Sequence, residues 1–418
     1  MLWREPRQPN PPNPAAAADT ARHQSGKVMG GGNGAERFSP DYVTVWEEGG
    51  GKRVRPIWKR SSSLRTLLIG VLCSGLFAPL GVAQRAQWEA LNQRLLELSR
   101  NGRYESGIQV AREALGIAEA TFGADDSNVA ISLNNLAEMC RLLGRYEEAK
   151  PLYERALRVA EQADGVESPL VAQTLNNMGE MYRTQGDSGR AEAMYSKAMA
   201  IREKYFGSEH PDLAQSLNNL ALLYAAQGRP EDAEPLYHRA VNIYRESLGA
   251  DHPLVAATLS NLAELYRSQE RFSEAEPLYQ EAIQIAKTQL GADHPTVAMN
   301  LNNLALLYAA RKKPKEAEQY FLEALAIQER RYGRESRASI TTLTNLATFY
   351  QDQRDYSDAE PVLRRLLRIA EKTYGQDHAA LVAPLNSLAE LYRKMGKKKE
   401  AEQFQARAQK VASAPATP

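Results

Sequence analysis

A ten-residue segment, LNNLALLYAA, occupies residues 217–226 and occurs again, unchanged, at residues 301–310 of this 418-residue chain. The copies are 84 positions apart, and steps of 42 residues from either copy reach further segments of the same pattern. These related segments begin at Leu91, Leu133, Leu175, Leu259, Leu343 and Leu385. The chain therefore holds eight segments in one register with no insertion between them, which indicates a tandem repeat of 42 residues.

A glycine follows the same period and supports this register. It stands at Gly123, Gly165, Gly207, Gly249, Gly291, Gly333 and Gly375. Because two unrelated landmarks share one spacing, chance is a poor explanation, and we place a repeat array over residues 84–411. Residues 412–418 are predicted to form a short disordered tail.

Each repeat carries the pattern of two amphipathic helices, here called helix A and helix B. In helix A, Leu133, Leu136 and Ala137 stand at i, i+3 and i+4, with Cys140 at i+7, which is one face of an α-helix. Helix B repeats that spacing over residues 149–157. A single helix pair cannot bury its apolar faces alone, so neighbouring repeats must stack and share a continuous core.

The ends of the helices also have recognisable residues. A glycine follows helix A in five repeats, where the chain needs a left-handed backbone. Glu270, Lys312 and Arg354 take that position in three others, so we expect those turns to be strained or differently shaped. Helix B is predicted to open with a capping box over residues 273–276, which places Pro277 at its fourth position.

Together these residues resemble the tetratricopeptide repeat, in which helix A is followed by the order G-x-Y-x-x-A-x-x-x-Y-x-x-A-L. The period of 42, the LNNLA-x-LY core and the G-x-D-H-P loops at 249–253 and 291–295 are similar to the subclass found in kinesin light chains and many bacterial proteins. The resemblance covers about residues 86–411. It implies an all-α, right-handed superhelical solenoid of about eight helix-turn-helix repeats, with the A helices along the concave face. It does not imply motor transport, because the heptad coiled coil by which kinesin light chains dock on the motor is replaced by a different N-terminal segment.

The N-terminal residues differ in composition from the array. Residues 1–60 are rich in proline and glycine and show no sustained apolar period, so we predict that they are disordered. Residues 61–83 have the order of a secretory signal peptide: a basic flank, an uncharged run of 17 residues from Leu67, and small residues before the boundary. Cleavage between Ala83 and Gln84 would release an exported, periplasmic protein.

Other interpretations of this segment stay open. An uncleaved 67–83 segment would anchor the chain in a membrane, since it is just short of the ~20 residues that span a bilayer. Lipid attachment at Cys73 is disfavoured because a leucine precedes it, where that signal needs a small residue. The signal also begins far from the first residue. Translation from Val54 or Leu64 would explain this, and tryptic peptides from the first fifty residues would contradict it.

The composition gives little support to catalysis, metal binding or nucleic-acid binding. Residues 84–418 hold 41 basic and 45 acidic side chains, so no electrostatic attraction to nucleic acid is expected. His210, His252 and His294 recur once per repeat, but equivalent residues of packed helices lie about 8–10 Å apart, too far for one metal ion. We interpret them as loop and helix-start residues. We find no nucleophile elbow, phosphate loop or Cys/His cluster, and predict no catalytic residue, no metal and no cofactor.

One asparagine position provides the first candidate ligand-binding residues. It recurs beside the apolar stripe of consecutive A helices, as Asn135, Asn177, Asn219, Asn261, Asn303 and Asn345. An amide side chain offers donors and an acceptor, so such a ladder could hold an extended peptide whatever its sequence. The resemblance implies the same role, because this asparagine contacts the ligand backbone in those families. The alternative is an asparagine bonded between neighbouring helices, and one side chain can do both.

The neighbouring positions would give specificity. Arg141, Arg183 and Arg267 each follow a glutamate by three residues, whereas the duplicated segments place Leu222 and Leu306 on the same face. A groove that alternates in this way would accept apolar anchors with charges between them. The alternatives are helix-surface ion pairs worth about 0.2–0.5 kcal/mol each, and a duplication without selection on that face.

Three functions follow from these observations. The preferred one is an exported, non-enzymatic scaffold that binds a protein or peptide ligand on its concave face, with no nucleic acid and no small-molecule cofactor as partner. A membrane is a partner only if residues 67–83 stay attached. The alternatives are an accessory subunit of a cell-envelope enzyme or secretion assembly, and a cytosolic regulatory adaptor, which requires that the apolar run is not a signal.

Overall fold

A computed structural model describes residues 78–413, and every regular element within them is helical. The α-helices are α1 (Ala78–Arg100), α2 (Tyr104–Phe122), α3 (Ser127–Leu142), α4 (Tyr146–Asp164), α5 (Pro169–Thr184), α6 (Ser188–Phe206), α7 (Pro211–Ala226), α8 (Pro230–Leu248), α9 (Pro253–Ser268), α10 (Phe272–Leu290), α11 (Pro295–Ala310), α12 (Pro314–Tyr332), α13 (Ile340–Asp352), α14 (Tyr356–Tyr374), α15 (Val382–Lys394) and α16 (Lys398–Ala412). Short 3₁₀ helices, η1 (Arg337–Ser339) and η2 (Ala379–Leu381), precede α13 and α15. The predicted disordered residues 1–60 and most of the predicted signal peptide lie outside the described residues. None of the described helices is long and apolar enough to cross a bilayer.

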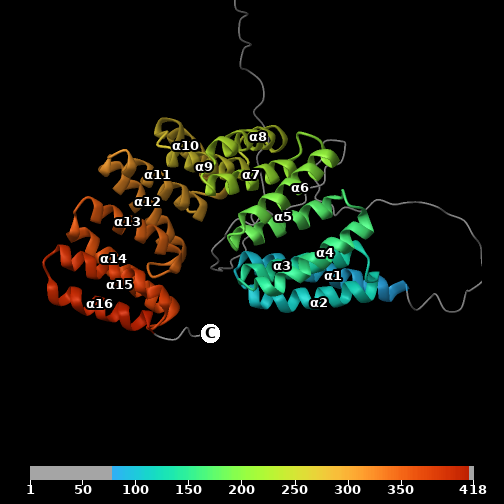
Figure 1. Cartoon of the computed structure of the whole chain (residues 1–418), viewed down its shortest axis with the longest axis horizontal. Coiled ribbons are helices and arrows are strands. Elements are labelled where there is room, and N and C mark those ends of the chain that lie inside the picture. The colour runs from blue at the N-terminus through green and yellow to red at the C-terminus, as the bar shows by residue number, and fades with distance from the viewer. Residues whose placement is uncertain (1–77, 414–418) are drawn as a thin grey trace, which may run out of the picture. The chain divides into compact units, whose positions relative to one another are not determined.

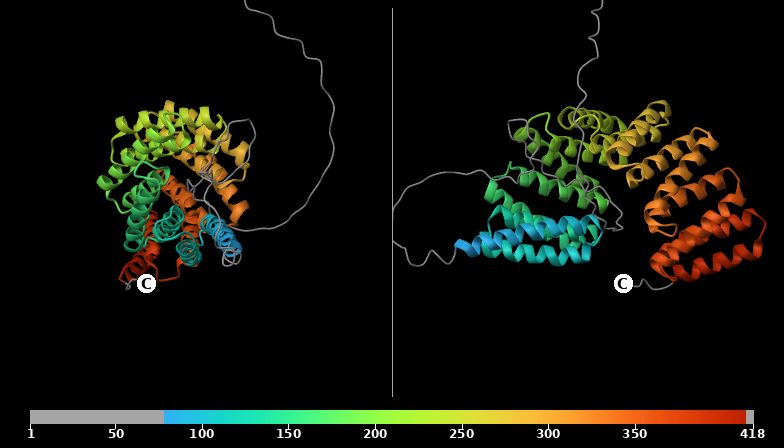
Figure 2. Two further views of the ribbon diagram at one scale, coloured as in Figure 1. Left: turned by 90° about the vertical axis from the view of Figure 1, so that its right-hand side faces the viewer. Right: turned by 180° about the vertical axis from the view of Figure 1, so that it is seen from behind.

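The helices follow one another in pairs, with odd numbers as A helices and even numbers as B helices (Figure 1). Each helix packs against the one before it and the one after it, and the further views in Figure 2 show the same order. Consecutive A helices also contact each other at α3–α5, α7–α9, α9–α11 and α11–α13, whereas contacts between consecutive B helices are weaker or absent. The predicted all-α solenoid is confirmed, and its A helices are the more closely spaced layer.

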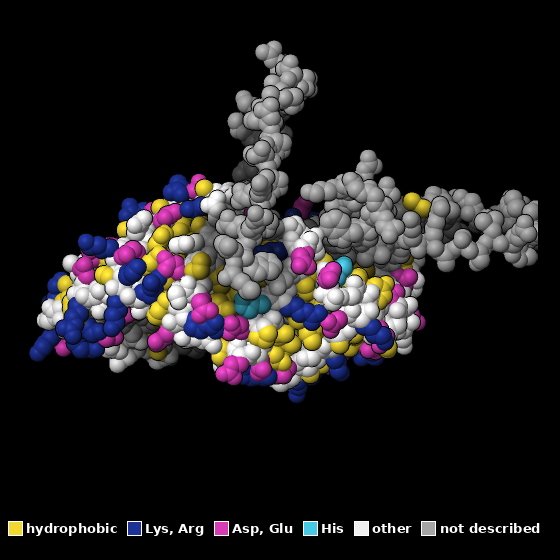
Figure 3. All heavy atoms as spheres, turned by 90° about the horizontal axis from the view of Figure 1, so that it is seen from above, with side chains coloured by type: hydrophobic (Ala, Val, Ile, Leu, Met, Phe, Trp, Pro, Cys, Tyr) yellow, Lys and Arg dark blue, Asp and Glu magenta, His cyan; other side chains and the backbone are white. Residues whose placement is uncertain are grey.

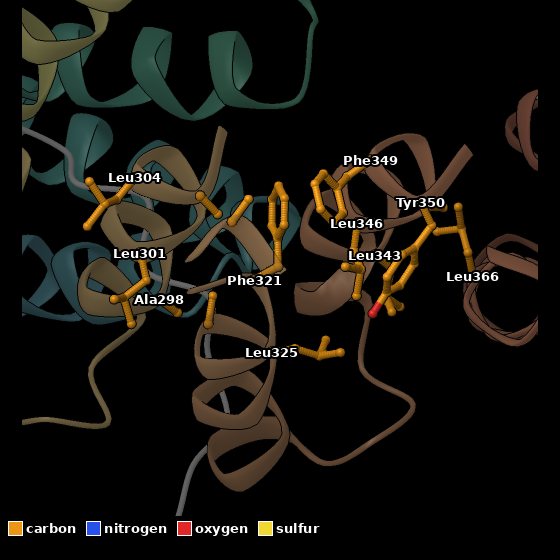
Figure 4. Close-up of a cluster of buried hydrophobic side chains, with 14 of the residues drawn as sticks. Ala298, Leu301, Leu304, Phe321, Leu325, Leu343, Leu346, Phe349, Tyr350 and Leu366 are labelled. Carbon is orange, nitrogen blue, oxygen red and sulfur yellow. The ribbon is translucent and has the colours of Figure 1, made fainter. Parts of the chain in front are cut away.

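The core is a continuous layer of apolar side chains between the A and B helices. Figure 4 shows one part of it, where side chains of α11 to α14 meet. Phe321 is fully buried, and its ring centroid lies 5.8 Å from that of Phe349 in the next A helix. The predicted apolar face of helix A is buried as expected, including Leu133 and Ala137. Cys140 is also buried, and this burial raises the pKa of its thiol.

The histidines stand at the starts of A helices, as the sequence predicts, and the structure shows that their side chains cap these helices. The Nδ1 atoms of His210, His252 and His294 accept the backbone N–H of the second residue of the following helix, at 3.1, 3.2 and 3.3 Å. A proline is the first residue of each of these helices, where its missing N–H has no partner to lose. An imidazole can accept this bond only while Nδ1 is unprotonated.

These caps are expected to make stability depend on pH. Burial lowers the pKa of His252 below its ordinary value of 6.5, so the folded chain resists protonation more than the unfolded chain does. The stabilisation is therefore present above pH 6.5 and is lost as the pH falls through the lowered folded value. His252→Asn keeps a capping side chain that does not titrate. The melting temperature of this variant should fall less than that of the wild type between about pH 7.5 and about pH 5.5; equal falls would contradict the prediction.

The predicted start of helix B is wrong. Helix α10 begins at Phe272 after Arg271, which makes no capping hydrogen bond with its side chain. Ser273 is therefore the second helical residue rather than the cap. Pro277 is the sixth residue rather than the fourth, so it lies inside the helix and leaves the carbonyl of Ser273 without its usual donor. Pro151, Pro235 and Pro361 stand at the same position of their helices.

The three turns without glycine have the same shape as the others. Glu270, Lys312 and Arg354 have φ angles of 60°, 58° and 60°, in the left-handed region that glycine adopts at this position, as at Gly228 with 70°. The expectation of strain is confirmed, and the expectation of a different shape is not. A side chain makes this conformation unfavourable because Cβ approaches the following carbonyl oxygen.

Replacing these residues with glycine is expected to stabilise the array. Each of Glu270→Gly, Lys312→Gly and Arg354→Gly should raise the free energy of unfolding by about 1 kcal/mol, since relief of strain exceeds the added entropy of the unfolded chain. Urea unfolding followed by circular dichroism would measure the change. The matched control is Gly228→Ala, which should lower stability by a similar amount. Unchanged midpoints in all four variants would contradict the account.

Candidate binding face on the A helices

The predicted asparagine ladder lies on the A helices, and its members are half-buried. Five of the six side chains donate Nδ2–H to the Oδ1 of an asparagine in the preceding A helix. These bonds join Asn135 to Asn92 (2.9 Å), Asn177 to Asn134 (3.2 Å), Asn219 to Asn176 (3.0 Å), Asn261 to Asn218 (3.0 Å) and Asn345 to Asn302 (3.0 Å). The ladder therefore links consecutive A helices, which is the alternative that the sequence left open.

Asn303 is the exception, because the preceding repeat lacks the matching asparagine. Ser260 stands there instead, and its hydroxyl lies 2.5 Å from Oδ1 of Asn300. The Oδ1 of Asn303 accepts a bond from Asn302 at 3.3 Å, and its Nδ2 has no partner among residues 78–413. The ladder is thus interrupted between α9 and α11, where neither N–H of one amide has a partner in the described part of the chain.

Asn177 is the most constrained member of the ladder. Its Oδ1 accepts a bond from Gln173 at 2.9 Å, and Oε1 of Gln173 accepts one from Arg202 at 2.7 Å. Arg202 comes from α6, is 2% exposed, and also donates to the hydroxyl of Ser216 in α7 at 2.9 Å. Burial lowers the pKa of this guanidinium. A buried cation thereby fixes one asparagine of the A face through a single glutamine.

The bonds between repeats do not exhaust the hydrogen-bonding capacity of the ladder. An amide side chain has two N–H donors and a carbonyl oxygen with two lone pairs, and each bonded member uses one N–H toward the preceding helix. Among residues 78–413, the second N–H of these side chains and at least one lone pair have no partner, and they lie on the half-exposed face. The structure thus holds the amides in fixed positions and leaves groups that can pair with a peptide bond.

The three predicted arginines are engaged by the glutamates that precede them. Nε and Nη2 of Arg183 donate to both carboxylate oxygens of Glu180, at 2.9 and 2.5 Å. The hydroxyl of Tyr195, from helix B of the same repeat, donates to that carboxylate at 2.7 Å. The same arrangement joins Arg141 and Arg267 to Glu138 and Glu264, with Tyr153 and Tyr279 as the third members.

The electrostatics of this cluster keep its charges fixed at neutral pH. Burial raises the pKa of Glu180, but the hydrogen bonds and charge of Arg183 outweigh it, so the pKa stays below its ordinary value. Burial raises the pKa of the Tyr195 phenol, and the neighbouring carboxylate raises it further. The glutamate is therefore ionised and the tyrosine protonated, and the arginine is an ion-pair partner rather than an isolated cation.

The duplicated segments give the A face a different chemistry. Leu222 and Leu306 take the position of these glutamates, and each is half-buried beside small alanines. Opposite Leu306, helix B carries Phe321 where the charged repeats carry tyrosine, so no hydroxyl is left without a carboxylate. At this position α3, α5 and α9 carry the glutamate–arginine pair, whereas α7 and α11 carry leucine. On the face shown in Figure 3, hydrophobic side chains are interspersed with charges of both signs.

A second series of tyrosine–glutamate bonds, which sequence reasoning missed, joins consecutive repeats. A tyrosine of helix A donates to a glutamate in helix B of the preceding repeat. The pairs are Tyr224–Glu192 (3.1 Å), Tyr266–Glu234 (2.9 Å), Tyr308–Glu276 (2.5 Å), Tyr350–Glu318 (2.7 Å) and Tyr392–Glu360 (2.6 Å). Burial and Glu234 raise the pKa of Tyr266 to about 12. The recurrence of a glutamate every 42 residues was the available signal.

The repeats match a known family along most of the chain. The family model described as tetratricopeptide repeat matches residues 98–162, 170–246, 212–288, 274–330 and 338–414. No curated protein matches the chain. The match to this family agrees with the helix pairs, the shared core and the period of 42 residues described above.

Two solved structures share this fold, and a third has a more similar sequence. The apo form of RapI has a TM-score of 0.52 at 14% identity, over 79% of this chain and 97% of that one. Aspartyl phosphate phosphatase F from Bacillus subtilis has a TM-score of 0.51 at 14% identity, over 83% and 88%. BtubC (BKLC) from P. vanneervenii is 25% identical, with a TM-score of 0.48, over 55% of this chain and 94% of that one. Because the family model matches more than half of the chain, the chain belongs to the tetratricopeptide repeat family.

Proposed function

We propose that this protein is a non-catalytic scaffold that binds an extended peptide segment of a partner protein along its A helices. The observation that carries the proposal is the asparagine ladder, whose amides are held by bonds between repeats and keep donors and acceptors on a half-exposed face. Such groups can pair with peptide N–H and C=O groups of any sequence.

The spacing of the ladder favours an extended ligand. Packed helices lie about 8–10 Å apart, so equivalent asparagines of touching A helices repeat at roughly that distance. A polyproline II segment rises about 3.1 Å per residue and presents the same side every three residues, which gives about 9 Å. One peptide group in three can therefore meet one asparagine of each repeat.

The apolar positions define the side chains that such a ligand would carry. Leu222 and Leu306 are two repeats apart, and the ion pair of Glu264 with Arg267 lies between them. At three ligand residues per repeat, a peptide would place apolar anchors about six residues apart, with a polar or charged residue between them. Burying each anchor would remove further surface of Leu222 or Leu306 from water.

A displayed library of random peptides, selected on the full-length protein, would test this function. We expect selected peptides to share two apolar residues about six positions apart. Their affinity should fall at least about tenfold in the variant Leu222→Glu/Leu306→Glu, because each anchor would then be buried against a carboxylate that lacks the arginine partner of the charged repeats. Exposed Leu322 on α12 provides the control, and Leu322→Glu should leave affinity unchanged. Selected peptides that bind all three proteins equally would place the site elsewhere.

We also propose that the scaffold is exported, through the segment 61–83. Cleavage after Ala83 would remove the first six residues of α1, and the core residues of that helix, which begin with Trp88, would stay in place. Cell fractionation should find the protein outside the cytoplasm, and deletion of residues 61–83 should retain it inside. Soluble cytoplasmic protein in both cases would favour the adaptor alternative, and wild-type protein in the membrane fraction would favour the anchor.

A further inference from the structure

Ion pairs cross the outer side of the array between consecutive B helices. At six junctions, a charged residue near the end of one B helix pairs with an opposite charge 36 residues later, in the middle of the next. The pairs are Glu119–Arg155 (2.7 Å), Glu203–Arg239 (2.5 Å), Arg245–Glu281 (2.6 Å), Lys287–Glu323 (3.3 Å), Glu329–Arg365 (2.5 Å) and Glu371–Arg407 (2.6 Å). Because B helices contact one another weakly, these pairs close the space between them.

The junction between α4 and α6 lacks this closure. The equivalent residues are Glu161 and Lys197, and neither side chain has an ion-pair or hydrogen-bond partner among residues 78–413. Both line a cavity of about 350 Å³. The structure thus shows an open junction with an unpaired carboxylate and an unpaired ammonium group beside a cavity.

The cavity itself is apolar. Helix α5 forms its floor, and α4 and α6 form its walls. The apolar lining includes Leu157, Val171, Leu175, Met178, Met194 and Ile201. Methionine fits irregular apolar shapes because it is flexible and polarisable, and two of the lining residues are methionines. Met178 stands where six other repeats have leucine, and Met194 stands where three others have leucine. Val166, in the loop before α5, also lines the cavity and is 64% exposed, which extends the apolar surface outward.

We propose that this cavity is a second binding site, separate from the A face, for one bulky apolar side chain in a segment of a partner protein. The cavity, at about 350 Å³, leaves room for a leucine, methionine or phenylalanine side chain. The segment would carry a basic and an acidic residue beside that side chain, because Glu161 and Lys197 present one charge of each sign at the cavity. A segment with charges of only one sign would meet repulsion from one of them.

Methyl NMR on the full-length protein, labelled at the methionine methyl groups, provides the test. The probes are the peptides acetyl-Lys-Leu-Glu-amide and acetyl-Glu-Leu-Lys-amide. We expect one of them to shift the signals of Met178 and Met194 saturably, with a dissociation constant on the order of 1–10 mM. The signals are assigned with Met178→Leu and Met194→Leu, since leucine occurs at both positions in other repeats. Replacing the central leucine of the peptide with alanine should weaken binding at least about tenfold.

Lys197→Arg is the decisive variant, because it recreates the glutamate–arginine pairs of Glu119–Arg155 and Glu203–Arg239 at the open junction. It should close the cavity mouth and weaken peptide binding at least about tenfold, with an unchanged or higher melting temperature. The absence of saturable shifts, or equal binding by Lys197→Arg, would overturn the proposal. Equal binding of acetyl-Ala-Leu-Ala-amide would also overturn it, since the cavity would then accept neutral apolar molecules without regard to the charged pair.

Discussion

Replacing Phe321 with alanine is expected to lower the free energy of unfolding by about 3–5 kcal/mol. The side chain is fully buried in α12, and its ring lies 5.8 Å from that of Phe349 in α13. The truncation would leave a cavity at the junction between two repeats (Figure 4), where the surrounding helices can relax only in part. The loss would therefore affect both the repeat and its contact with the next one.

Hydrogen exchange with mass spectrometry would measure this effect and its location. Since each repeat contacts only its neighbours, amides of α11 to α14 should exchange faster, and those of α3 to α5 should keep their protection. The neighbouring Leu322 is 46% exposed, so Leu322→Ala is the matched control and should change stability by less than about 0.5 kcal/mol. Faster exchange along the whole array would contradict the account of repeats that are stabilised by local contacts.

The second large effect is expected at Glu180. Glu180→Leu should destabilise the protein by about 2–3 kcal/mol, because it leaves Arg183 and the hydroxyl of buried Tyr195 without their common acceptor. Urea unfolding at neutral pH would measure the loss. The folded pKa of Glu180 lies below its ordinary value of 4.5, so the stabilisation is present above that pH. It is lost as the pH falls through the folded value, and the variant should then approach the wild type.

The duplicated repeat supplies the control for this experiment. At the positions of Glu180, Arg183 and Tyr195, the repeat at 301–342 carries leucine, alanine and phenylalanine. The triple variant Glu180→Leu/Arg183→Ala/Tyr195→Phe copies this apolar set and should recover most of the lost stability, since no polar group is then left unpaired. A triple variant as unstable as the single one would show that the hydrogen bonds of the cluster are not the cause.

Much of the fold could be predicted because its signals repeat. Two helices per 42 residues follow from the spacing of leucine and alanine, and the helix-start position of His252 follows from the proline after it. The start of helix B was predicted two residues too late, because Ser273 looks like a cap. The turn before α10 is short because Glu270 adopts a left-handed backbone conformation. Helix α10 therefore begins at Phe272, two residues after Glu270.

The positions of the candidate site residues could be predicted from the sequence, but their hydrogen bonds could be predicted only in part. The spacing fixed which asparagines share a face, but an amide can pair with a neighbouring helix or a ligand, and sequence alone does not choose. The motif carries another asparagine directly before the ladder asparagine. Asn176 of one repeat, for example, accepts the bond from Asn219 of the next, and this recurring second amide was the available sign of a bond between repeats. The tyrosine on Glu180 comes from another helix, and the bridges between B helices join residues 36 apart, so a search within single helices misses both.

The most direct test of the central claim compares two triple variants in their affinity for a library-selected peptide. Asn177→Ala/Asn219→Ala/Asn345→Ala removes three amides of the A face. Asn134→Ala/Asn176→Ala/Asn302→Ala removes the buried acceptors of those amides, so both variants lose the same three bonds between repeats.

Fluorescence anisotropy with a labelled peptide would give both affinities. The account predicts at least about a tenfold loss for the first variant and little change for the second, because only the first removes groups that can pair with the peptide backbone. Equal affinities, whether both retained or both lost, would contradict it. The asparagine ladder would then serve to join the repeats, and the A face would not hold a peptide through it.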